Sequence, residues 1–324
     1  MFTDMPEPEL REYRSRQVDP PDFDGFWADT LAEAQAAAAT TAPLLTKVDS
    51  GLSALDVFDL TFAGFNGEPI KAWLRVPAGS TEPLPTVVEF VGYGGGRGRP
   101  WENLFWAAAG FAHVQMDTRG QGSAWSAGDT SDAFDATGPQ FPGVMTRGIR
   151  DRSTYYYRRL MTDAVRAVGA ARQLPQVDGS RLGVYGRSQG GALALAAAAL
   201  APGVSAVAAA VPFLADFPRA SVITNANPFK EIGSYLAIHR DEVDLVHRTL
   251  AYFDSVNFAR RGRVPALFTV ALMDEITPPS TVFAAHNAYA GQKELVVWPY
   301  NGHEAGGPDD DDRIRAFFAK QLTA

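Results

Sequence analysis

The pentapeptide Gly-Arg-Ser-Gln-Gly at residues 186–190 contains a serine that could act as a nucleophile. An apolar run, Leu-Gly-Val-Tyr-Gly at 182–186, precedes it, and the small residues typical of a closely packed helix follow it. A serine on such a strand–turn–helix elbow exposes its hydroxyl above the sheet, and the flanking Gly186 and Gly190 leave room for the helix to pack on the strand. We therefore predict that Ser188 is a nucleophile. The alternative is that Ser188 only caps the helix.

A serine hydroxyl attacks a carbonyl only when a base takes its proton, and histidine is the usual base. The chain has five histidines. His113 lies inside an apolar run before the serine and is predicted to be packed, whereas His239, His247 and His286 lie in helical segments. His303 follows the strand-like run Leu-Val-Val-Trp-Pro-Tyr and begins a loop. This position after the serine, at the end of a strand, makes His303 the predicted base.

A carboxylate should orient the histidine, and in this type of site it lies between the serine and the histidine in the chain. Asp274 ends the apolar run Val-Pro-Ala-Leu-Phe-Thr-Val-Ala-Leu-Met-Asp and is the predicted acid. Asp254 is the rival, but its helical or loop context favours a capping or buried structural role. Glu304, next to the histidine, is predicted to support the loop.

Acyl transfer also needs two hydrogen-bond donors for the oxyanion. One predicted donor is the backbone N–H of Gln189, the residue after the serine. The other is the backbone N–H of Tyr93, in the glycine-rich loop 92–96. A phosphate-binding loop is disfavoured there because no Gly-Lys-Ser or Gly-Lys-Thr follows.

The elements that must position these residues alternate along the chain, which predicts one α/β domain with a mostly parallel sheet. Two strands joined by a hairpin are expected first, at 57–62 and 70–76. Further strands are expected at 85–91, 111–116, 182–186, 204–211, 264–272 and 294–298. Helices are expected at 101–110, 154–174, 189–200, 279–290 and 313–321.

Three segments depart from this alternation. Residues 1–50 are predicted to form a helical extension, with a strong helix-forming run at 29–41. Residues 123–152 are rich in Gly, Pro and Asp and are predicted to be a long loop insertion. Residues 217–260 are predicted to be a mixed helical excursion that covers the carboxyl ends of the strands, where such sheets bind ligands.

Composition excludes several classes of protein. The 324-residue chain has a net charge of −8, which disfavours nucleic acid and anionic membranes as partners. It contains no cysteine, so disulfides, thiolate metal sites and cysteine nucleophiles are excluded. The uncharged stretch 189–215 is interrupted by Pro-Gly at 202–203, which favours a buried helix and strand over a membrane span. The charged N-terminus lacks a secretory signal, so we predict a cytoplasmic protein.

Taken together, these motifs resemble carbohydrate esterase family seven, the acetyl xylan esterases and cephalosporin C deacetylases of the α/β-hydrolase superfamily. Three motifs carry the resemblance: Arg119-Gly120-Gln121, Gly186-x-Ser188-Gln189-Gly190 and His303-Glu304. The resemblance extends over roughly residues 5–320.

The resemblance implies an α/β-hydrolase fold with Ser188, Asp274 and His303 as a triad and the Tyr93 and Gln189 amides as the oxyanion hole. It implies removal of acetyl or other short acyl groups from small esters such as xylooligosaccharides and cephalosporins. It also implies a hexamer whose active sites face an interior cavity. No cofactor or metal is needed for this chemistry.

We interpret Arg119, Gly120 and Gln121 as structural support of the site. Two positions depart from the family pattern as we expect it. Arg187 stands in the elbow where glycine is expected, and it either points away, alters the pocket or pairs with a carboxylate. Thr277 stands where cysteine is expected, a mild exchange that should leave the triad intact.

Two other functions stay open. A serine peptidase or acyl-aminoacyl hydrolase would use the same fold, although no propeller-sized N-terminal segment is present. A non-catalytic binding protein of this fold would usually lack one member of the triad, whereas all three are present here.

Overall fold

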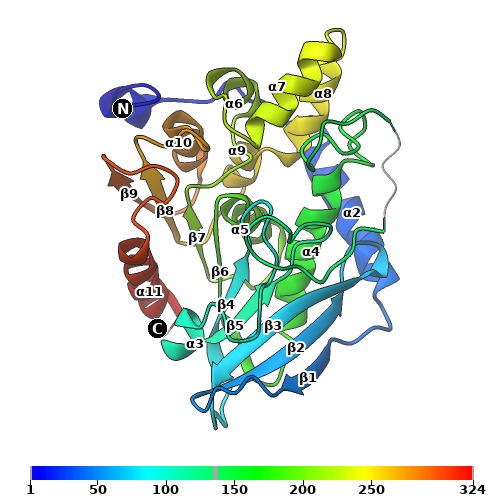
Figure 1. The fold of residues 1–324 in the computed structure, drawn as a ribbon, viewed down its shortest axis with the longest axis vertical. Helices are drawn as coiled ribbons and strands as arrows, with labels where there is room; N and C mark the ends of the chain where they lie inside the picture. Colours follow the sequence, from blue (N-terminus) through cyan, green and yellow to red (C-terminus); the bar gives the residue numbers. More distant parts are fainter. Residues whose placement is uncertain (1, 134–137, 323–324) are drawn as a thin grey trace.

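A computed structural model describes residues 2–133 and 138–322 (Figure 1). Within these residues, nine strands form one sheet in the order β1-β2-β3-β5-β4-β6-β7-β8-β9. The strands are β1 Leu44–Val48, β2 Leu55–Ala63, β3 Pro69–Pro77, β4 Leu84–Phe90, β5 Ala112–Met116, β6 Val177–Arg187, β7 Ala206–Ala210, β8 Ala266–Ala271 and β9 Lys293–Trp298. The first three strands and β5 pair antiparallel, and all pairings from β5 through β4 to β9 are parallel.

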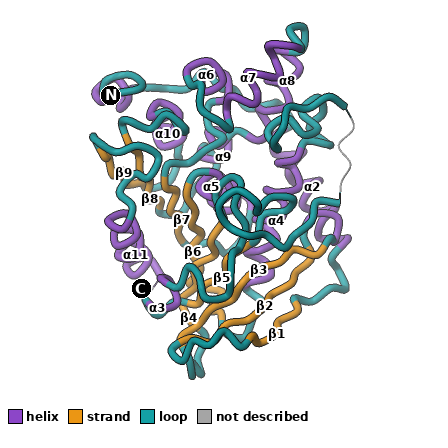
Figure 2. The backbone as a smooth tube through the Cα atoms, in the orientation of Figure 1, coloured by secondary structure: helices purple, strands orange, loops and turns teal. Residues whose placement is uncertain are grey.

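Helices cover both faces of this sheet (Figure 2). On one face, α4 and α5 bury Val88 and Phe90 of β4 in the main apolar cluster. On the other face, Trp106 of α3 and Phe318 of α11 pack against Val87 of β4. The helices are α1 Glu7–Glu12, α2 Phe23–Ala37, α3 Phe105–Ala108, α4 Tyr156–Ala171, α5 Gln189–Leu200, α6 Phe217–Ile223, α7 Phe229–Ile238, α8 Val243–Leu250, α9 Ser255–Ala259, α10 Pro279–Ala288 and α11 Pro308–Leu322, with short 3-10 turns η1 Phe65–Gly67 and η2 Ala251–Phe253.

The predicted α/β alternation and the β2–β3 hairpin are confirmed. The prediction of a helical extension over residues 1–50 is wrong at its end, because residues 44–48 form β1. This segment, Leu-Leu-Thr-Lys-Val, pairs antiparallel with β2, which supplies the partner that an edge strand needs. The predicted helix at 101–110 is also too long. The helix α3 has only one turn, and residues 101–104 before it form a turn and irregular chain.

The two predicted excursions lie near the carboxyl ends of the parallel strands. Residues 217–260 form α6 to α9, at the top of Figure 1. The described parts of the insertion, 123–133 and 138–152, contain turns and loops but no helix or strand, while its residues 134–137 lie outside the described chain. In the part of the chain that the structure describes, no helix has the length and apolar character needed to cross a bilayer.

Candidate active site

Ser188 occupies the sharp turn between β6 and α5. Its backbone has φ 58° and ψ −120°, a region that non-glycine residues rarely adopt. The structure describes every residue of α5, and the Ser188 side chain makes no capping hydrogen bond to this helix. The alternative that Ser188 only caps the helix therefore has no support. Ser188 is 8% exposed and lines a cavity of about 870 Å³. The strained turn thus presents the hydroxyl to this cavity.

The two elbow glycines allow α5 to lie directly against β4 and β6. A Cβ atom on Gly190 would lie 2.0 Å from the carbonyl oxygen of Phe90, and one on Gly186 would lie 2.2 Å from the carbonyl carbon of Gly190. Both distances are shorter than atomic contact permits. The sharp turn at Ser188 therefore depends on residues without a side chain at both positions.

Asp274 and His303 meet at the carboxyl ends of β8 and β9. The His303 Nδ1 atom lies 2.8 Å from Oδ2 of Asp274, which is completely buried. The backbone N–H groups of Ile276 and Thr277 donate to Oδ1, and the Thr277 hydroxyl donates to Oδ2 at 2.7 Å. The carboxylate is therefore held in one orientation. Because His303 Nδ1 donates to it, Nε2 is left to accept a proton.

The loop after β4 brings Tyr93 into the wall of the same cavity. Its hydroxyl donates to Oε1 of Glu231 at 2.7 Å and accepts the backbone N–H of Val144 at 2.8 Å. The indole N–H of Trp125 donates to the Tyr93 carbonyl oxygen at 2.8 Å. The side chain and the backbone of Tyr93 are thus both fixed by hydrogen bonds.

Gln121 connects this loop to the elbow. Its Oε1 accepts the backbone N–H of Gly94 at 2.6 Å, and its Nε2 donates to Oε1 of Gln189 at 3.0 Å. The two predicted oxyanion donors are the backbone N–H groups of Tyr93, the neighbour of Gly94, and of Gln189 itself. A single side chain therefore couples the two segments that carry these donors.

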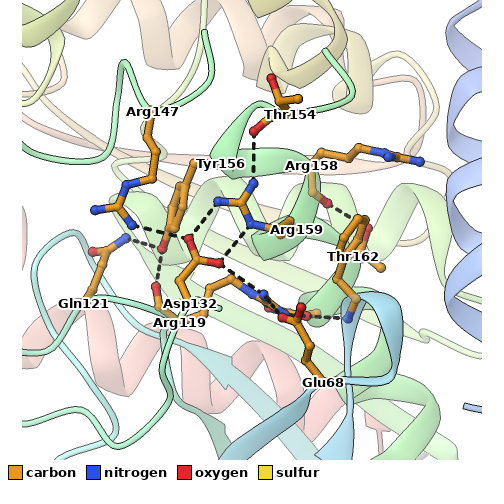
Figure 3. Close-up of polar contacts among 12 residues, drawn as sticks. Glu68, Arg119, Gln121, Asp132, Arg147, Thr154, Tyr156, Arg158, Arg159 and Thr162 are labelled. Atoms are coloured by element: carbon orange, nitrogen blue, oxygen red, sulfur yellow. Dashed lines mark hydrogen bonds and ion pairs between the residues drawn. The ribbon is translucent and has the colours of Figure 1, made fainter. Parts of the chain in front are cut away.

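Arg119 is not among the residues that line the cavity. It is completely buried, donates twice to Asp163 and also pairs with Glu68 and Asp132. Figure 3 shows Asp132 between Arg119, Arg147 and Arg159. These ion pairs join the turn before β3, the insertion and α4 to the loop after β5.

Arg187 does not point away from the site. Its guanidinium lines the cavity and donates to the backbone carbonyl of Glu304 at 3.0 Å, and it lies 3.5 Å from the carboxylates of Asp310 and Asp311. The Glu304 carboxylate accepts N–H groups from Asn301 and Gly302. Both residues therefore brace the loop that carries the candidate base.

The other candidate acids and bases are placed elsewhere. Asp254 caps α9 and accepts three backbone N–H groups, so its role is structural. His113 is completely buried and hydrogen-bonds to Glu89. The remaining histidines, at 239, 247 and 286, are not among the residues that line the cavity.

The structure adds residues that the sequence analysis did not identify. Glu231, on α7, anchors the Tyr93 hydroxyl and is 4% exposed. Burial raises the pKa of its carboxyl, and the hydrogen bonds from Tyr93 and Met145 oppose that rise. Trp125 and Pro228 line the cavity. No local motif marks these positions, since they come from the two excursions.

Comparison with solved structures places this fold in a known class. The α/β hydrolase GrgF from Penicillium sp. sh18 superimposes with a TM-score of 0.57 at 15% identity, covering 83% of this chain and 99% of that one. At this level of identity the likeness concerns the fold alone. The chain thus has the α/β-hydrolase fold, as predicted.

Closer relatives define the family within that class. The acetyl xylan esterase from Paenibacillus sp. R4 is 36% identical, with a TM-score of 0.90 over 98% of this chain and 100% of that one. The acetyl esterase Axe7A of Xylanibacter ruminicola is 31% identical over 294 residues, 88% of this chain and 63% of the relative, so this chain spans less than two thirds of that protein. The profile of the acetyl xylan esterase (AXE1) family matches residues 1–321, and the chain belongs to this family.

Proposed function

We propose that this chain is a serine esterase that removes acetyl groups from small esters. Membership of the acetyl xylan esterase family supports the reaction. The observation that carries the mechanism is the 2.8 Å contact between His303 and the buried Asp274, on the same cavity as the strained Ser188. A base oriented by a carboxylate, on the same cavity as a serine hydroxyl, is what acyl transfer to serine requires.

In the proposed reaction, His303 Nε2 takes the Ser188 proton as Oγ attacks the ester carbonyl carbon. The N–H groups of Tyr93 and Gln189 stabilise the resulting oxyanion. Collapse of this intermediate breaks the carbon–oxygen bond of the ester, and protonated His303 gives its proton to the leaving alcohol. Water then attacks the acyl-enzyme with His303 as base, and acetate leaves as Ser188 regains its proton. Asp274 keeps the imidazole in the productive tautomer and stabilises its positive charge.

The proposed substrates are acetylated xylooligosaccharides and cephalosporin C, as the family resemblance implies. The cavity volume, about 870 Å³, accommodates an alcohol far larger than the acetyl group. We further propose a cytoplasmic hexamer whose interior active sites admit small esters and not polymeric xylan.

A panel of p-nitrophenyl esters tests the acyl specificity. We expect kcat/KM to be highest for the acetate and to fall for the butyrate and octanoate. A preference for the octanoate would overturn the assignment as an acetylesterase and leave the triad standing. Labelling of the chain by a fluorophosphonate, located at Ser188 by mass spectrometry, would test the nucleophile separately.

A further inference from the structure

The cavity extends well beyond the position of the acetyl group. Besides Ser188 and His303, it is lined by side chains from β4, the turn before α3 and the start of α11. This part of the wall would face the alcohol portion of an ester bound at Ser188. Its charges therefore bear on which alcohols the site accepts.

Carboxylates outnumber guanidinium groups in this wall. Four acidic side chains line the cavity, namely Glu89, Glu102, Glu304 and Asp311. Only two arginines do so, Arg97 and Arg187. The chain as a whole also carries a net charge of −8, so the surrounding field has the same sign.

Both arginines are already paired with carboxylates. Arg97 bonds to Asp59 at 2.7 Å and to Asp129 at 2.9 Å, and neither aspartate lines the cavity. Arg187 lies 3.5 Å from both Asp310 and Asp311. Each positive charge thus faces two negative ones, and little is left to attract an anion.

Glu89 contributes a carboxylate that hydrogen-bonds to the neutral Asn103 in the cavity wall and to the buried His113 behind the wall. Asn103 donates to its Oε1 at 2.9 Å, and His113 Nε2 lies 2.9 Å from its Oε2. The other ring nitrogen of His113 faces the guanidinium of Arg75, which can only donate, so we assign the ring proton to Nε2. Burial lowers the pKa of the His113 imidazole, and the hydrogen bond to Glu89 opposes that shift. The guanidinium of Arg75 lies beyond this ring, 3.5 Å from Nδ1, and its positive charge offsets part of the Glu89 charge from behind the cavity wall.

We propose that these carboxylates make the site select acetyl esters of neutral alcohols over esters of anionic alcohols, with Glu89 as a determinant of this selectivity. The inference rests on the proposed esterase function. It ranks neutral acetylated sugars above cephalosporin C, whose leaving alcohol carries carboxylate groups. A carboxylate at a separation of about 8 Å changes the affinity for a unit charge by up to about fivefold in a partly hydrated site at low salt.

A matched pair of esters tests this proposal. Methyl 4-acetoxybenzoate is neutral, and 4-acetoxybenzoate carries one negative charge on a leaving group of almost the same shape. The measurement is the ratio of their kcat/KM values, each divided by the rate of hydroxide-catalysed hydrolysis of the same ester. It is made with wild type, Glu89→Gln and the control Glu82→Gln, which removes an equal charge from an exposed loop outside the cavity.

We expect wild type to prefer the neutral ester by about fivefold to tenfold at low salt, and this preference to shrink at about 1 M salt. Glu89→Gln should lower the preference about threefold, and Glu82→Gln should leave it unchanged. A wild-type preference near one, or one that salt does not change, would overturn the proposal without any variant being needed. Absence of turnover with both esters would instead overturn the proposed function and this inference with it.

Discussion

Thr277 shows how one hydroxyl takes part in orienting the candidate base. Its Oγ1 donates to Asp274 Oδ2 at 2.7 Å, the same oxygen that receives His303 Nδ1. We predict that Thr277→Val, which keeps the shape and removes the donor, lowers kcat about tenfold, the worth of one hydrogen bond to a charged group. Thr277→Ser keeps the hydroxyl and should retain most of the activity. Steady-state kinetics with p-nitrophenyl acetate checks both, and equal losses in the two variants would contradict the role.

At the residue scale, the sequence predicted the positions that follow strands. Ser188 and Asp274 follow apolar runs closely, and His303 lies in the loop after the last one. Chain order separated His303 from His113, and the helical context of the other three histidines excluded them. Glu231 could not be found in this way. It lies in a helical excursion, where a glutamate is ordinarily on the solvated face, and only the tertiary structure brings it to Tyr93.

At the scale of elements, the approach of α5 to β4 depends on glycine. We predict that Gly190→Ala lowers the free energy of unfolding by at least about 2 kcal/mol, because its Cβ would lie 2.0 Å from the Phe90 carbonyl oxygen. Gly169→Ala is the matched control, since this residue lies in the last turn of α4 and a Cβ there meets nothing within 4 Å. The control should stabilise the chain by about 0.5–1 kcal/mol. Urea unfolding at one protein concentration measures both changes, and similar stability in the two variants would refute the close-approach explanation.

The contact between α7 and the Tyr93 loop should depend on pH. Burial raises the pKa of Glu231 above its ordinary value of 4.5, so the unfolded chain ionises first as pH rises. This group therefore favours the unfolded state above about pH 4.5. We predict that wild type loses stability relative to Glu231→Gln between pH 4.5 and 7.5. Melting temperatures at the two pH values give the measurement, and a constant difference, or one of opposite sign, would contradict the prediction.

The sequence also predicted most of the elements, for a physical reason. Strands buried on both faces, such as β7 and β8, are continuous apolar runs, and this pattern can be recognised in the sequence without tertiary information. The two wrong predictions concern short elements whose conformation depends on tertiary contacts. The strand β1 is half exposed and takes its conformation from pairing with β2, and α3 is a single turn that its packing against Phe111 and Tyr185 holds in place.

At the scale of the whole molecule, the family resemblance leads us to propose a hexamer. We predict a mass of about six times the 34.9 kDa of one chain. Static light scattering coupled to size-exclusion chromatography measures this directly. A monomer mass would remove the proposed interior chamber and leave the chemistry of each active site unaffected.

The most direct test of the account is the turnover of p-nitrophenyl acetate by Ser188→Ala. The structure places this serine on a strained elbow facing the cavity that also contains His303, so we predict a loss of kcat/KM of more than about a thousandfold. Ser80→Ala, which removes a hydroxyl from an exposed turn, should retain full activity. A Ser188→Ala protein that kept more than about a thousandth of the wild-type rate would contradict the proposed acyl-enzyme mechanism.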